Sequence, residues 1–164
     1  MWRRLRQHHG LEHATITLLS RRMRDASLFA RSDLTGFTVF GAVDTALLRQ
    51  AVEEALARLQ AGERTLAVHP NCGTNVATAG VLAGVAALLA GGGQKRSFWW
   101  ERLPSAVLAA TLALLAAAPV GRWLQEHITT SSQVEDLCLA AIERVSDGPV
   151  VVHRVTFTAR EQAS

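Results

Sequence analysis

The residues with the clearest potential for chemistry lie near the N-terminus, where His9, Glu12 and His13 form the pattern His-x-x-Glu-His. In a helix, side chains four residues apart lie on one face, one turn above the other. The two imidazoles are therefore spaced as ligands for one divalent metal ion. Neutral histidine is a common ligand of zinc. A carboxylate directly before the second histidine can take a proton from a coordinated water. The pattern predicts a zinc site at His9 and His13, with Glu12 as the general base.

A second segment, 69–75, also concentrates side chains that bind metals or polarise substrates. It reads His-Pro-Asn-Cys-Gly-Thr-Asn, and its proline and glycine predict a turn. Turns held between rigid elements often carry binding groups. His69 as the third ligand would leave the open position of a catalytic zinc site, whereas adding Cys72 would close it into a structural site. Asn71 or Asn75 could donate a hydrogen bond to a developing oxyanion. The alternative is a structural turn whose Asn side chains bond their own backbone.

The elements that must position these residues begin with a helix over residues 3–25, indicated by apolar side chains at three- and four-residue steps. Gly10 is unfavourable inside a helix. It indicates either that another segment approaches the backbone closely or that the helix breaks there. Residues 26–36 are expected to form a loop and residues 36–43 a strand. Asp44 is expected to cap a helix that ends at Ala61.

Further along the chain, Glu63–Val68 has the composition of a strand and residues 126–132 that of a loop. Residues 134–145 have an ambiguous period that fits either a helix or a strand. The segment 150–158 is the clearest strand of the sequence, and the turn residues at 146–149 before it predict a terminal β-hairpin.

Two nearly continuous apolar runs occupy residues 76–93 and 103–124. Each has about the 20 residues needed to cross a bilayer. The residues between them combine charges with three aromatic side chains, and Trp123 stands at the opposite boundary, as expected at lipid headgroups. The sequence predicts a transmembrane helical hairpin. A buried hairpin in the core of a soluble protein is the alternative, because the runs are rich in alanine.

Composition restricts the remaining possibilities. The chain has 164 residues, of which 49% are hydrophobic, and a formal net charge of +3. This length suits one domain with a substantial core. The two cysteines are far apart in sequence, so we expect no disulfide framework and a reducing compartment. No cleavable signal peptide is expected, because polar residues interrupt the apolar run that would follow the basic N-terminus.

The expected partners follow from charge and from small residues. Arginines concentrate in the first two dozen residues, next to Trp2, and such a segment can lie against anionic lipid. No motif typical of nucleic-acid binding accompanies them, so we expect a lipid bilayer as partner and no nucleic acid. Gly80 and Gly84 make a small-residue face through which helices, or two copies of the chain, could pack.

Together these features predict an α+β fold, with a small extramembrane domain that contains a short sheet and a two-helix transmembrane hairpin. Residues 1–75 and 125–164 would form the extramembrane domain and residues 76–124 the hairpin. A two-helix hairpin returns both ends of the chain to one side of the membrane. The arginine-rich N-terminal segment favours the cytoplasmic face of the inner membrane.

Two resemblances add expectations. The motifs His-Gly-Leu-Glu-His-Ala-Thr at 9–15 and His-Pro-Asn-Cys-Gly-Thr-Asn at 69–75 resemble a family of uncharacterised bacterial membrane proteins, found in cyanobacteria and other phototrophic or filamentous lineages. That resemblance covers most of the chain and implies no function. The His-x-x-Glu-His pattern resembles the inverzincin metallopeptidases, in which both histidines hold zinc and the glutamate is the base. There a glutamate from a neighbouring helix is the third ligand, a role that Glu53 or Glu54 could take here.

The leading functional hypothesis is a small membrane-integrated zinc metallopeptidase that acts on a peptide or protein. His9, His13 and His69 would hold one Zn²⁺, Glu12 would act as base, and Asn71 would stabilise the oxyanion. The first alternative is a non-catalytic metal- or haem-binding membrane protein. The second is a scaffold subunit of a membrane complex.

Overall fold

The computed structural model describes residues 1–23, 27–92, 99–148 and 150–160. The chain divides into two compact units. The first, which we call the sheet unit, comprises Met1–His69 and Glu126–Ser164, and the second, the hairpin unit, comprises Pro70–Gln125. The predicted α+β class is confirmed, because a four-stranded antiparallel sheet occurs together with two long apolar helices.

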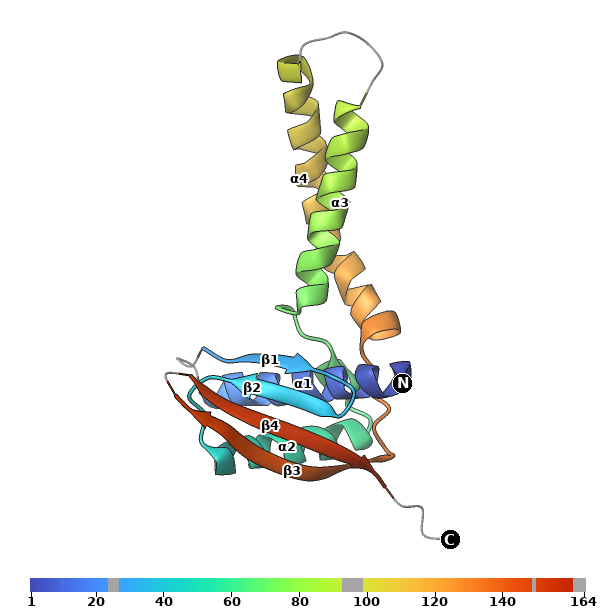
Figure 1. Cartoon of the computed structure of the whole chain (residues 1–164). Coiled ribbons are helices and arrows are strands. Elements are labelled where there is room, and N and C mark those ends of the chain that lie inside the picture. The colour runs from blue at the N-terminus through green and yellow to red at the C-terminus, as the bar shows by residue number, and fades with distance from the viewer. Residues whose placement is uncertain (24–26, 93–98, 149, 161–164) are drawn as a thin grey trace. The chain divides into compact units, whose positions relative to one another are not determined.

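The sheet unit contains the strands β1 (Phe29–Ser32), β2 (Gly36–Phe40), β3 (Leu137–Asp147) and β4 (Val151–Ala159). Their spatial order is β1-β2-β4-β3, and every neighbouring pair is antiparallel. The last strand of the chain therefore lies in the middle of the sheet, between β2 and β3 (Figure 1). The predicted terminal β-hairpin is confirmed as the β3–β4 pair.

Two helices cover one face of this sheet, α1 (Trp2–Arg22) and α2 (Thr45–Gln60) (Figure 1). Asp44 caps α2 as predicted, because its carboxylate accepts hydrogen bonds from the backbone N–H groups of Ala46 and Leu47. The alternative in which Gly10 breaks the first helix is wrong, since α1 is continuous through it.

The core of the sheet unit lies between these two layers. On β4 the side chains of His153, Val155 and Phe157 alternate inward, which is the period-two burial of a strand with one covered face. Facing them are apolar side chains of α1 and α2. The fully buried ones include Leu11, Leu19, Leu48, Val52 and Leu59, together with Phe37 and Val39 from β2.

Three local predictions were wrong or left open. Residues 29–32, expected within a loop, form the edge strand β1, which is short and pairs on one side only. Residues 64–67, expected to be extended, form the 3₁₀ turn η1 (Arg64–Ala67), which buries Leu66 and Ala67 without joining the sheet. The ambiguous segment is β3, whose register shifts near residues 140 and 145 interrupt the alternation of side chains.

The predicted loop at 126–132 also begins differently, because a π-helical turn, η2 (Gln125–Thr129), continues directly from the preceding helix. Residues 130–136 then lead into β3. From Glu126 onward this segment belongs to the sheet unit.

The hairpin unit consists of α3 (Gly73–Gly91) and α4 (Trp99–Leu124), which pack side by side (Figure 1). Helix α3 begins three residues before the predicted apolar run, because Cys72 acts as its N-cap. The Cys72 Sγ accepts a hydrogen bond from the backbone N–H of Thr74, with an N–S distance of 3.4 Å. The helical stretches Gly73–Gly91 and Trp100–Thr129 are both long and apolar enough to cross a membrane. Only 6% of the most apolar 18-residue segment of each stretch is buried, whereas the core helix of a soluble protein is mostly buried. The exposed apolar surface is consistent with membrane association.

His8 is buried between α1 and the sheet and couples folding to pH. Its Nδ1 lies 2.8 Å from the carbonyl oxygen of Asp33, and its ring stacks on Phe157 with a centroid distance of 5.6 Å. Burial lowers the pKa of His8 below its ordinary 6.5, against the opposing effect of the Asp33 carbonyl. The Arg154 guanidinium holds the pKa of the Asp33 carboxyl well below its usual range.

We expect the sheet unit to lose stability as the pH falls below about 6.5, because the unfolded His8 then binds a proton that the folded state resists. His8→Gln keeps a donor for the Asp33 carbonyl but does not titrate, so it should flatten this part of the pH profile. The measurement is hydrogen exchange of the β4 amides from pH 5 to 8, corrected for intrinsic rates. The control is His127→Gln, at an exposed position. Equal slopes for wild type and His8→Gln would contradict the assignment.

Candidate metal centre

His9 and His13 lie side by side in the middle of α1, as their spacing predicts. Their ring centroids are 4.4 Å apart and the rings meet edge to face at 64°. His69, the last residue of the sheet unit, follows η1 and brings a third ring to the pair, with its centroid 5.9 Å from that of His13. Two imidazoles on one tetrahedral zinc ion place their centroids about 5 Å apart, given Zn–N bonds of about 2 Å. The observed separations lie on either side of that value.

Hydrogen bonds at the opposite side of each ring fix the two helix histidines. His13 Nδ1 lies 2.8 Å from the carbonyl oxygen of Ala67, and His9 Nδ1 lies 3.0 Å from that of Thr129. A carbonyl oxygen can only accept, so each Nδ1 carries a proton and donates it. In a neutral ring Nε2 then holds the lone pair that binds metals. Donation of the second ring nitrogen to a carbonyl is the usual support of a metal-binding histidine.

Gly10 allows these carbonyls to reach α1. A Cβ atom at this position would lie 2.3 Å from the carbonyl oxygen of Ser131 and 3.4 Å from the Ala67 Cβ. The expectation that another segment approaches the backbone at Gly10 is therefore confirmed. Both approaching segments are those that supply the carbonyl acceptors for His9 and His13.

Glu12 is on the same helix, three residues after His9, and is only 8% exposed. Burying a carboxylate is costly unless it lies close to cations or hydrogen-bond donors. A buried acid next to a metal-binding histidine is therefore a candidate for function as well as for structure.

The second segment divides between the two units. Asn71 is exposed, and Cys72 is buried at the start of α3. Asn75 has a structural role in the hairpin unit, where its Nδ2 donates to the Pro70 carbonyl at 2.7 Å and its Oδ1 accepts from Gln125 at 2.8 Å. Asn75 therefore fits the alternative of a structural turn, because its side-chain amide is hydrogen-bonded within the hairpin unit.

Glu53 and Glu54 form ion pairs with arginines. Glu54 pairs with Arg22 and Arg58, and Glu53 lies 3.7 Å from Arg49. Arg22 is nine residues after His13 on α1, which corresponds to about 14 Å along a helix. The Glu54 carboxylate, which pairs with Arg22, is therefore held far from the histidine pair and is not suited to be its third ligand.

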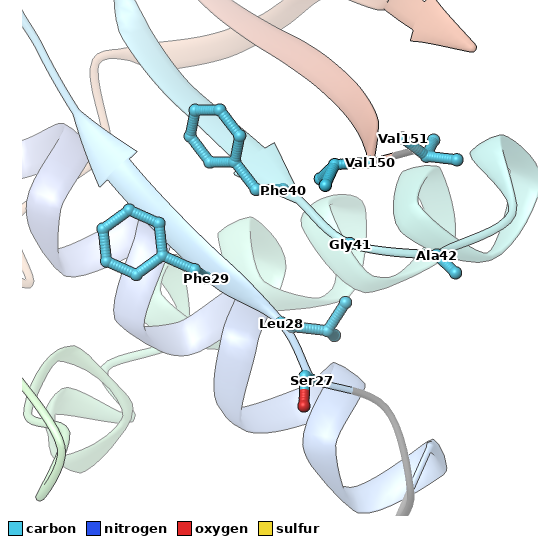
Figure 2. A pocket seen from close by; sticks show the side chains of 8 residues that line it. All are labelled: Ser27, Leu28, Phe29, Phe40, Gly41, Ala42, Val150 and Val151. Atoms are coloured by element: carbon cyan, nitrogen blue, oxygen red, sulfur yellow. The ribbon is translucent and has the colours of Figure 1, made fainter. Parts of the chain in front are cut away.

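One open pocket, of about 350 Å³, lies elsewhere in the sheet unit, at the end of β2 (Figure 2). Phe29 and Phe40 form one wall, with ring centroids 5.8 Å apart. Among the described residues that line it, none is ionisable. The lining residues are Ser27, Leu28, Phe29, Phe40, Gly41, Ala42, Val150 and Val151.

We expect Gly10→Ala to weaken both folding and metal binding, because the new methyl group would collide with the Ser131 carbonyl. Overpacking of this kind costs about 1–3 kcal/mol. The measurements are hydrogen exchange of the sheet unit and Zn²⁺ affinity. Gly84→Ala is the matched helix control, since a Cβ there meets no described atom within 4 Å. A Gly10→Ala protein as stable as wild type would show that the close approach is not needed.

Comparison with known proteins places the chain among relatives without an assigned activity. It is 36% identical over 157 residues to an uncharacterized protein of Picosynechococcus sp. (strain ATCC 27264 / PCC 7002 / PR-6). That match covers 87% of this chain and 73% of the relative. No solved structure matches significantly. Residues 4–142 match the family model described as a domain of unknown function, DUF6391. The chain therefore belongs to the DUF6391 family.

Proposed function

We propose that the protein is a membrane-associated zinc hydrolase in which His9, His13 and His69 bind one divalent ion. The observation that carries this proposal is the pair of carbonyl-held imidazoles on α1, each with Nε2 as its metal-binding nitrogen. The neighbouring His69 ring adds a third nitrogen donor of the same kind. Three protein ligands and an open position are typical of catalytic zinc.

Glu12 is the general base of the proposed reaction. Bound Zn²⁺ would supply Lewis acidity, which lowers the pKa of a coordinated water toward 7. Glu12 follows His9 by three residues, on the helix that carries both ligands, and its carboxylate would accept the proton of that water and return it to the leaving amine. Asn71 is the proposed donor to the oxyanion that forms on the carbonyl of a peptide substrate.

A second function is a closed, non-catalytic metal site. Its ligands would be the three histidines together with the thiolate of Cys72. Cys72 follows His69 by three residues, so the chain keeps the two Cα atoms within about 11 Å. With all four residues as ligands, zinc would have no open position and the protein would store or sense the ion.

We further propose that α3 and α4 insert into the inner membrane and that the sheet unit is cytoplasmic. The exposed apolar surface of the two helices and the exposed Trp100 and Trp123 support a bilayer as partner. In the hairpin unit, a Cβ at Gly80 or Gly84 would meet no described atom within 4 Å. This face is therefore open to a second copy of the chain.

We expect purified protein in mild detergent to bind one Zn²⁺ per chain, and His13→Ala to lose it. The measurement is elemental analysis after dialysis against a weak chelator. His127→Ala is the control, because this side chain is exposed and outside the cluster. Equal metal in both variants would exclude the site. An absorption spectrum of the same preparation tests the haem alternative, and protein without any metal favours a scaffold.

We expect Glu12→Gln to retain the metal and lose hydrolysis, because the amide cannot accept the proton. The measurement is cleavage of a quenched-fluorescent peptide library by the zinc-loaded protein. Normal cleavage by Glu12→Gln would contradict the role of the base. Cys72→Ser separates the two functions, since it should reduce Zn²⁺ affinity only if the thiol is a ligand and the site is closed.

A further inference from the structure

Arg6 lies one helical turn before His9 on α1 and holds the segment that supports the His9 ring. Its Nη2 donates to the carbonyl oxygens of His127 at 2.9 Å and Thr130 at 2.8 Å, and its Nε donates to Thr130 at 3.1 Å. The backbone joins the same contact, because the Ser131 N–H donates to the Arg6 carbonyl at 2.9 Å.

Of the two carbonyls that Arg6 binds, that of His127 lies in the π-helical turn η2 and that of Thr130 directly follows its end. The last carbonyls of a helix carry a partial negative charge, which a cationic side chain stabilises. A guanidinium presents its donors in a fixed planar fork, so it fixes the direction of two carbonyls at once. The carbonyl of Thr129 lies between them in sequence and accepts from His9 Nδ1.

We propose that Arg6 is a positioning residue of the metal centre. By capping the His127 and Thr130 carbonyls it keeps the Thr129 carbonyl on His9 Nδ1, and so keeps Nε2 as the nitrogen that binds the ion. This assignment rests on the proposed metal site. It places the support of the first ligand in a residue that the His-x-x-Glu-His pattern does not include.

A structural explanation alone would predict an effect on folding and none on the metal. Arg6 is half-buried and ties α1 to the segment before β3, so its loss should also weaken the sheet unit. Gln7 makes a similar tie further along, from its Nε2 to the Gln133 carbonyl at 2.6 Å and the Asp136 carboxylate at 2.7 Å. This second tie keeps the segment attached when Arg6 is changed.

The test is the Zn²⁺ affinity of the full chain in detergent, measured by competition with a chromophoric chelator. Loss of a residue that supports a metal ligand typically costs 10- to 100-fold in affinity, and we expect about this loss for Arg6→Gln. Arg6→Lys retains one charged donor and should recover part of it. The charge-matched control is Arg3→Gln, since Arg3 is exposed and pairs with Asp136, which Arg4 also binds. This control should bind zinc as wild type does.

A double-mutant cycle separates positioning from general destabilisation. If Arg6 acts through His9, Arg6→Gln should cost no further affinity in a His9→Ala background. An equal cost with and without His9, or wild-type affinity in Arg6→Gln, would overturn the proposal. Should Arg6→Gln fail to fold by hydrogen exchange of β4, wild-type affinity in Arg6→Lys would overturn it instead. A wild-type chain that binds no zinc would refute the metal site itself, which is a different result from zinc binding that ignores Arg6.

Discussion

The candidate metal centre depends on two hydrogen bonds from imidazole N–H groups to main-chain carbonyls. The His13 bond joins residues 54 positions apart, and the His9 bond joins residues 120 positions apart. Each bond fixes which nitrogen carries the proton and how far the ring can rotate. An isolated α1 helix would have neither constraint. The arrangement of the pair is therefore a product of the tertiary fold, although both residues lie on one helix.

The buried residues His8 and His153 show how the pair of His9 and His13 differs from histidines of the core. His8 also bonds a carbonyl through Nδ1, but its ring stacks on Phe157 between the helix and the sheet. His153 is fully buried, and its Nε2 lies 2.9 Å from the Thr45 hydroxyl. Each is surrounded by core side chains of the sheet unit. The His13 ring, in contrast, lies beside two other imidazoles, with centroids 4.4 Å from that of His9 and 5.9 Å from that of His69.

Sequence patterns predicted the parts of this arrangement that depend on side chains in one element. The period of α1, the Asp44 cap and the apolar runs all describe local preferences, and the structure has them as expected. The 3₁₀ turn that ends at Ala67 and the π-helical turn that ends at Thr129 were not predicted, because they bond His13 and His9 on α1 through main-chain carbonyls. Main-chain carbonyls leave no side-chain signal. Gly10 was the one local trace of their approach, since its missing Cβ is required by a neighbour distant in sequence.

The chemistry of the proposed site is decided in the short segment that follows η1. His69 ends the sheet unit and Cys72 caps α3, with Pro70 and Asn71 between them. Proline fixes its own φ and restricts the residue before it, so His69 has less backbone freedom than an ordinary loop residue. A site limited to the three histidines keeps an open position for water, whereas recruitment of the thiol would remove it. In the proposed site, recruitment of Cys72 would therefore decide whether the ion keeps a water for Glu12 to deprotonate.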